Sequence, residues 1–385
     1  MKIAITIFKI FISLFIIVIL CGFYPIRVLV NPGLKNSNLS KSQNIHSQAN
    51  KSSHIGDLRV ETTFNENHSI PTDRVVVPIH QMLINNNIIR YYIPITIGHT
   101  QLNAMLDTGS PGIWVLPGAT HKDDLNLTNQ ITAINYGSGV KLKGVVANAT
   151  ISVGTFHSRE PIPIDAVQTI GCTPKHPNCA ASRVSQQDYR LGSSGSPDKG
   201  FKAIIGVNLL AHARVNNPLP EIGVHKWILV LPKPGDTQPG SLILNPNMND
   251  LAGFAQFKLD STNSPRDGIP ASITNLRTNK QVSGPAMLDT GMPGIHVVTR
   301  ERKRKQLRFK KGDEVRISFT SKNGNVEPIN FKASSKGPTH IKVTPPKGNQ
   351  PSSGVFAGVL PYFTYRVLYD SDHGIIGLKL RSGKQ

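Results

Sequence analysis

Two aspartates stand in nearly identical sequence contexts, 182 residues apart. Asp107 lies in the segment 104–115 and Asp289 in the segment 286–297, and ten of the twelve positions in the two segments are identical. Each apolar run leads into Asp-Thr-Gly, where glycine permits a tight turn and a close approach of backbone N–H groups to the carboxylate. Two carboxyl groups that share one site do not both ionise cheaply, so one supplies an acid and the other a base. The repeat therefore predicts a carboxylate pair that activates a water molecule against an amide carbonyl.

Short β-rich runs surround both aspartates. From Ile88 onward, runs such as 91–98 and 227–231 are separated by Gly, Pro, Asn and Asp, and helical periodicity is scarce. Closely spaced strands with turn signals between them are typical of an all-β architecture. We expect two related β lobes, residues 87–247 and residues 248–385, each with one Asp-Thr-Gly loop and with the active-site cleft between them.

Several blocks of the sequence together resemble the pepsin-like aspartic peptidase family. They are the two Asp-Thr-Gly loops, Ser110, Trp114, the run Tyr136-Gly137-Ser138-Gly139, and the segments 203–206, 356–358, 365–370 and 375–378. The resemblance covers residues 88–385. It implies the bilobal all-β pepsin-like fold, aspartic endopeptidase activity on a polypeptide substrate, and no cofactor or metal.

The resemblance also implies roles for individual residues. Asp107 and Asp289 would hold the lytic water, one as general base and the other as donor to the substrate carbonyl oxygen. Thr108 and Thr290 would hydrogen-bond across the two loops and fix their spacing. The residues that follow them would stabilise the shared negative charge through their N–H groups, namely Gly109 and Gly291.

The run 136–139 would form a flexible hairpin, or flap, over the substrate. The Tyr136 hydroxyl is expected to hydrogen-bond to the Trp114 indole. Two glycines in the run, Gly137 and Gly139, would let the hairpin move as a water-excluding lid.

The two loops differ at a position close to the chemistry. Ser110 offers a hydroxyl to Asp107, whereas the corresponding residue of the second loop is Met292, which cannot donate. A hydrogen bond to a charged group is worth about 1.5–3 kcal/mol. Its loss at Asp289 is expected to raise the pKa of the pair and to move the working range to less acidic pH. Because a fold does not by itself establish activity, a catalytically silent pepsin-like binding or inhibitory protein of the cell envelope is the alternative.

Residues 1–24 are strongly apolar. The 22 residues from Ile3 to Tyr24 are enough to span a bilayer, and no Ala-x-Ala cleavage site follows them. They predict an uncleaved signal-anchor, with a cleaved signal peptide as the alternative, and both place the remaining chain outside the cytoplasm. Residues 25–86, rich in Asn, Ser, Lys and His over much of their length, are expected to form a polar stem or a removable pro-segment.

The chain is strongly basic, with 43 Lys and Arg against 23 Asp and Glu and a formal net charge of +20. Eight of the twelve residues of Arg300–Lys311 are basic. We expect this run to form a solvated face or to contact an anionic envelope surface. Nucleic acid is disfavoured because Phe309 is the single aromatic residue in the run and the chain is expected to be exported. We expect a monomer.

Three cysteines are too few for a disulfide scaffold. Cys172 and Cys179 enclose a short loop and can form one disulfide in an oxidising compartment, with two free thiols as the alternative.

Overall fold

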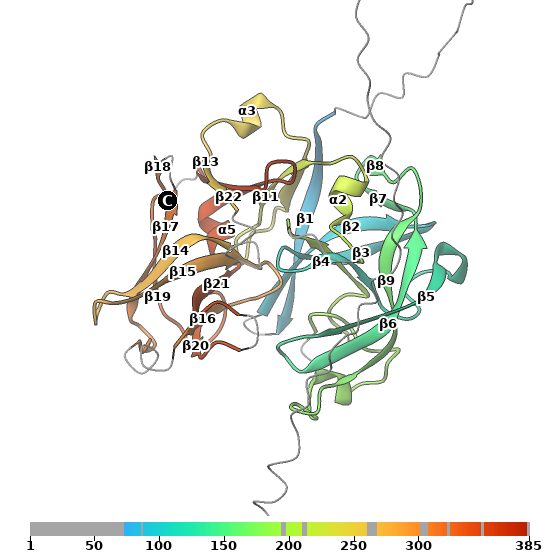
Figure 1. Cartoon of the computed structure of the whole chain (residues 1–385), viewed down its shortest axis with the longest axis horizontal. Coiled ribbons are helices and arrows are strands. Elements are labelled where there is room, and N and C mark those ends of the chain that lie inside the picture. Colours follow the sequence, from blue (N-terminus) through green and yellow to red (C-terminus); the bar gives the residue numbers. More distant parts are fainter. Residues whose placement is uncertain are drawn as a thin grey trace, which may run out of the picture. The chain divides into compact units, whose positions relative to one another are not determined.

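The structure is a computed structural model that describes residues 73–85, 88–193, 198–209, 214–259, 268–300, 307–321, 324–347 and 350–382. The apolar segment 1–24 and the stem up to residue 72 lie outside the described residues. Within those ranges, no helix is both long enough and apolar enough to span a membrane. The described chain is mostly β, as the sequence predicts, and its strands form two sheets (Figure 1).

The larger sheet has fifteen strands, with the main order β13-β23-β22-β11-β12-β1-β2-β3-β10-β4-β9-β6-β5. Its strands are β1 (Val75–Asn85), β2 (Ile88–Ile97), β3 (Thr100–Asp107), β4 (Pro111–Val115), β5 (Asn126–Asn135), β6 (Val140–Ala149), β7 (Ile151–Val153), β8 (Phe156–His157), β9 (Ile162–Cys172), β10 (Ala203–Val207), β11 (Lys226–Val230), β12 (Gly240–Leu244), β13 (Ala255–Lys258), β22 (Tyr365–Asp370) and β23 (Ile375–Leu380).

The smaller sheet has eight strands, with the main order β18-β17-β14-β15-β21-β16-β20. Its strands are β14 (Gly268–Asn275), β15 (Lys280–Leu288), β16 (Ile295–Thr299), β17 (Glu314–Ser321), β18 (Gly324–Asn325), β19 (Ile329–Lys332), β20 (Ile341–Thr344) and β21 (Ser353–Gly358). The helices of the described ranges are short: α2 (Pro218–Glu221), α3 (Met248–Leu251), α5 (Leu360–Thr364), and the 3₁₀ turns η1 (Lys122–Asp124) and η2 (Ala180–Ser182).

The same three-strand arrangement holds each aspartate. In the larger sheet β3 ends at Asp107 and runs parallel to β10, which in turn pairs antiparallel with β4. In the smaller sheet β15 ends just before Asp289 and runs parallel to β21, which pairs antiparallel with β16. The sequence repeat is therefore also a structural repeat, and it presents both aspartates at the ends of central strands.

The first strand corrects one expectation. Residues 75–85 were assigned to the polar stem or pro-segment, but they form β1, which pairs with both β12 and β2. Val77 and Ile79 are buried while Val76 between them is 45% exposed, the period-two pattern of a half-buried strand. The β-rich part of the chain thus already includes Val75–Asn85, ahead of Ile88.

Strands from both ends of the chain share the larger sheet. The C-terminal strands β22 and β23 pair with each other, and β22 pairs with β11, which places Tyr369 opposite Trp227. The rings of these two residues stack with centroids 5.6 Å apart, and both are buried. The main hydrophobic core contains residues of both sheets, so burial of apolar area stabilises the position of one aspartate loop relative to the other.

Candidate active site

The two Asp-Thr-Gly loops meet so closely that each glycine lies against the carboxyl group of the other loop. A Cβ atom on Gly109 would lie 2.4 Å from Asp289 Cγ, and one on Gly291 would lie 2.6 Å from Asp107 Oδ1. Real Cβ atoms essentially never approach other atoms so closely, so only glycine fits at these two positions. The structure brings Asp107 and Asp289 into one site.

The threonines of the two loops form the predicted cross-links. The Thr108 N–H donates to Thr290 Oγ1 at 3.0 Å, and the Thr290 N–H donates to Thr108 Oγ1 at 3.0 Å. Each hydroxyl also donates to a backbone carbonyl of the opposite strand, Leu288 and Leu106 respectively. Both threonines are 1% exposed, so these buried polar groups are satisfied by one another and fix the spacing of the loops.

A tyrosine pair that was not predicted from the sequence lies next to this network. The Tyr362 hydroxyl lies 2.8 Å from Thr108 Oγ1 and 2.6 Å from the Tyr369 hydroxyl. Tyr362 belongs to α5 and Tyr369 to β22. The C-terminal segment therefore contacts the first Asp-Thr-Gly loop through the Tyr362 hydroxyl. The feature of the sequence that could have indicated this pair is the cluster of tyrosines near the C-terminus, at positions 362, 365 and 369.

The two aspartates have unequal surroundings. Asp107 accepts hydrogen bonds from the Gly109 N–H at 2.8 Å and from the Ser110 hydroxyl at 2.7 Å, as predicted. Asp289 accepts from the Gly291 N–H, but its Oδ1 is buried and has no hydrogen-bond partner in the described part of the chain. Burial raises the pKa of Asp289, and the nearby charge of Asp107 raises it further.

Met292 accounts for part of this asymmetry. Its side chain packs in an apolar cluster with Met287, Val298 and Phe356, in the place where the first loop has the hydroxyl of Ser110. The pair therefore contains a carboxylate stabilised by two donors and a carboxyl group whose environment favours the protonated form. This arrangement suits one proton shared between an acid and a base.

Arg90, which was also not predicted from the sequence, lies at the same site. Its Nη1 donates to the carbonyl oxygen of Gly291, which joins β2 to the second loop. Burial lowers the pKa of Arg90, while the charges of Asp289 and Asp107 act in the opposite direction. The sequence signal was available, since Arg90 is the one charged residue in the run 88–97.

The predicted flap lies at the tip of the β5–β6 hairpin. The Tyr136 N–H donates to the Val140 carbonyl at 2.8 Å, and the Gly139 N–H donates to the Tyr136 carbonyl at 2.9 Å. The pKa of Tyr136 is raised, first by burial and then by the charge of Asp107, which places this tyrosine near the aspartate pair.

The prediction that the Tyr136 hydroxyl hydrogen-bonds to the Trp114 indole is wrong. Among the hydrogen bonds of the described ranges, none joins these two side chains. Trp114 is 6% exposed and lies with Met105, Leu142 and Phe201 in an apolar cluster against which Tyr136 also packs. The contact is therefore apolar rather than hydrogen-bonded.

Cys172 and Cys179 form the predicted disulfide, and their loop touches the flap. The Thr173 N–H donates to the Gly139 carbonyl at 2.8 Å. Gly139 has a φ of +89°, and a Cβ atom there would lie 2.3 Å from His176 Cβ, so glycine is required. The disulfide loop therefore holds one side of the flap.

A cavity of about 240 Å³ adjoins the second aspartate loop. Its lining is mainly apolar and includes Ile89, Tyr91, Pro293 and Val359, and Lys336 is its one charged residue. Ile89 precedes Arg90 in β2, and Pro293 follows Met292. Within the described ranges, no group of three or more His, Cys, Asp or Glu side chains is placed to hold a metal ion.

No protein-family model matches this chain, and no curated protein sequence does. Among solved structures, the chain is similar to the aspartic proteinase from Irpex lacteus, with a TM-score of 0.52 and 12% sequence identity. The match covers 80% of this chain and 98% of that protein. At this identity the likeness concerns the fold alone. The chain has the bilobal, all-β fold of the pepsin-like proteins.

Proposed function

We propose that the protein is an aspartic endopeptidase that hydrolyses peptide bonds with a water molecule activated by Asp107 and Asp289. The observation that carries the proposal is the meeting of two carboxyl groups, one from each structural repeat, in one site, where Asp107 is buried and Asp289 is half-buried. The cross-linked Thr108 and Thr290 support it, because they hold the two loops at a fixed spacing.

The unequal surroundings assign a role to each carboxyl group. Asp107, which accepts two hydrogen bonds, is the ionised general base and takes a proton from the attacking water. Asp289, whose pKa is raised by burial, is the acid and donates its proton to the substrate carbonyl oxygen. The resulting tetrahedral diol collapses when Asp107 returns the proton to the leaving nitrogen and Asp289 recovers its own. No covalent intermediate and no metal are needed.

A polypeptide substrate fits the surroundings of the pair. The flap at 136–139 would lie over the peptide, and its tyrosine would help to exclude water from the reacting bond. The apolar cavity beside Pro293 is suited to an apolar substrate side chain.

Cleavage of a denatured protein between pH 3 and 7, with and without a pepstatin-like transition-state mimic, tests the proposal. We expect cleavage that the mimic blocks and that metal chelators and serine-directed reagents leave unchanged. If the mimic binds, as measured by calorimetry, but no peptide bond is cut at any pH, the catalytically silent alternative is correct.

We also propose that the basic region around Arg300–Lys311 contacts an anionic envelope surface. Residues 301–306 lie outside the described residues, but Arg308, Lys310 and Lys311 are exposed, as are the neighbouring Arg277 and Lys280. Opposite charge on an envelope surface would attract such a group of cations.

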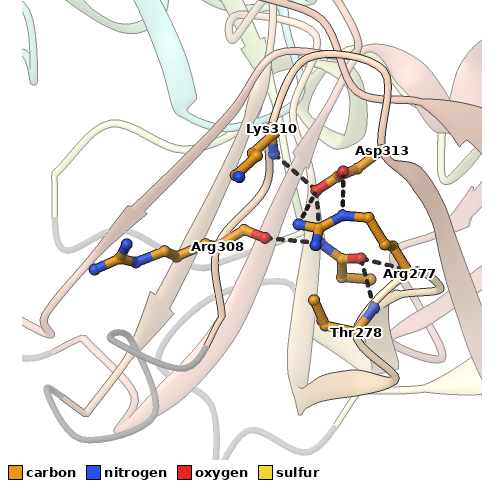
Figure 2. Close-up of polar contacts among 6 residues, drawn as sticks. Arg277, Thr278, Arg308, Lys310 and Asp313 are labelled. Atoms are coloured by element: carbon orange, nitrogen blue, oxygen red, sulfur yellow. Dashed lines mark hydrogen bonds and ion pairs between the residues drawn. The ribbon is translucent and has the colours of Figure 1, made fainter.

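A buried polar network supports this surface (Figure 2). Asn275 donates to the Arg308 carbonyl at 2.7 Å, and Asp313 accepts from the Lys310 N–H at 2.8 Å and from Arg277 Nε at 2.7 Å. The network fixes the backbone at Arg308 and Lys310, while the Arg308 side chain points away from Asp313. Arg308, Lys310 and Lys311 thus stand on a backbone that does not have to order on binding.

The placement of the protein is proposed to be extracytoplasmic, either anchored by residues 1–24 or secreted. Two measurements test this placement. Extraction of membranes with salt distinguishes an apolar anchor from an electrostatic attachment, and the N-terminal residue of the mature protein shows whether residues 1–24 are removed. An apolar anchor keeps the protein in the membrane fraction at 1 M salt, because screening does not weaken apolar burial, whereas attachment through Arg300–Lys311 alone is released. A soluble product that begins between residues 22 and 60 would contradict the anchor.

A further inference from the structure

Arg90 is a cation placed beside the aspartate pair. It lies on β2, and its Nη1 donates to the carbonyl oxygen of Gly291 in the second loop. The Gly291 N–H donates to Asp289, and a Cβ atom on Gly291 would contact the Asp107 carboxyl group. Gly291 therefore adjoins both carboxyl groups. The guanidinium is thereby held next to the place where the pair carries its negative charge.

The charge of Arg90 needs a partner. A guanidinium keeps its proton in proteins, and a cation withdrawn from water is costly unless an opposite charge compensates it. Arg90 Nε is buried without a hydrogen-bond partner, and no salt bridge between described residues includes Arg90. Its hydrogen bond to the neutral carbonyl of Gly291 does not balance a full charge.

The groups that face Arg90 leave one source of compensation. Among the described residues, its electrostatic neighbours are Asp289, Asp107 and Tyr189. Burial raises the pKa of Tyr189 to about 12, so this phenol is neutral at physiological pH. Tyr136, which lies near Asp107 and Tyr189, also has a raised pKa and is neutral. The negative charge opposite Arg90 is therefore that of the aspartate pair.

We propose that Arg90 is the counter-charge of the aspartate pair, a positioning residue that stabilises the singly ionised pair and ties the second loop to β2 through the Gly291 carbonyl. This inference deepens the proposed function, because it concerns the ionisation of the same two carboxyl groups. One cation and a pair with a single negative charge give a site that is neutral overall. Because a nearby cation favours ionised carboxyl groups, both protons of the pair leave at lower pH than they would without Arg90, and the loss of the Asp289 proton reports this effect.

The test is a titration that does not require catalysis. The ¹³C signal of the Asp289 carboxyl group, assigned by its loss in Asp289→Asn, is followed against pH in the full chain and in Arg90→Gln and Arg90→Lys. An opposite charge within about 4–6 Å lowers a carboxyl pKa by about 1–3 units. We therefore expect the midpoint to rise by about one unit or more in Arg90→Gln and to stay near the wild-type value in Arg90→Lys.

Arg381→Gln is the matched control. Arg381 is also partly buried and donates to backbone carbonyls, those of Leu231 and Tyr362, but its electrostatic partners are Asp236 and Tyr91. It should lower stability without moving the Asp289 midpoint. An equal shift in Arg90→Gln and Arg381→Gln would show a general structural effect and would overturn the inference.

A second measurement covers the case in which Arg90→Gln does not fold. In the wild-type chain, the ¹⁵N resonances of the Arg90 guanidinium should shift at the pH at which the Asp289 signal titrates. Guanidinium resonances that stay constant across that pH would overturn the inference. If the wild-type chain cleaves peptides and the Asp289 midpoint in Arg90→Gln equals that of the wild type, the role proposed for Arg90 is refuted while the proposed function stands. If the wild-type chain does not cleave peptides but the Asp289 midpoint shifts in Arg90→Gln, the proposed function is refuted while the role of Arg90 stands.

Discussion

Ser110 and Met292 occupy equivalent positions of the repeat, yet they give the neighbouring aspartates different surroundings. The Ser110 hydroxyl donates to Asp107, while the Met292 side chain packs among apolar residues and leaves Asp289 Oδ1 without a partner in the described chain. A donor favours the ionised carboxylate, and its lack favours the protonated form. A single side-chain difference between the two copies thus helps to decide which aspartate is the base and which is the acid.

Met292→Ser is predicted to move the alkaline limb of the pH–rate profile to lower pH. The new hydroxyl would donate to ionised Asp289 and lower its pKa, so the acid loses its proton at lower pH. Ser110→Ala is the reciprocal control and should move the acidic limb to higher pH, since the base loses a donor. The measurement is kcat/KM against pH for the three proteins. An alkaline limb that stays in place in Met292→Ser would show that residue 292 does not set the protonation of the pair.

The flap depends on an element outside its own hairpin. The loop closed by Cys172 and Cys179 binds the Gly139 carbonyl through the Thr173 N–H and packs His176 against Gly139. A disulfide that closes such a short loop limits how far this support can move away. The hairpin alone, with exposed Gly137 and Ser138 at its tip, is otherwise free to open.

Replacing both cysteines by serine is predicted to loosen the flap and to lower the free energy of unfolding by about 2.5 kcal/mol, the chain-entropy value for a loop of this length. Hydrogen exchange of the flap residues should become faster, and the effect on KM should exceed that on kcat if substrate contacts are lost. Exchange measured by mass spectrometry, with the β14–β15 hairpin as internal reference, gives the readout. Faster exchange spread equally over both hairpins would point to global destabilisation instead.

The whole molecule shows which features the sequence could predict. The repeat of twelve residues predicted two equivalent loops, and both the parallel neighbours of their strands and the threonine cross-links confirm it. The all-β class and the disulfide followed from local patterns and are confirmed too. Such features are encoded in short segments, where residue type and spacing determine the local conformation.

Features that depend on distant segments escaped prediction. β1 was assigned to the stem because its pairing with β12, more than 150 residues away, is invisible in its own sequence. Arg90 and Tyr362 look ordinary until the fold brings them to Gly291 and Thr108. The hydrogen bond assigned to Tyr136 and Trp114 came from resemblance, and the packing in this chain does not form it.

The activity of single aspartate variants tests the function of the pair most directly. Peptide cleavage by the purified protein is compared with that of Asp107→Asn and Asp289→Asn, each of which removes half of the acid–base pair. The control is Asp313→Asn, another buried, hydrogen-bonded aspartate that lies outside the site. We predict that each pair variant loses at least about 10²–10⁴-fold in kcat while remaining folded, and that Asp313→Asn stays active per folded molecule. Cleavage that persists in both pair variants would contradict the aspartic mechanism.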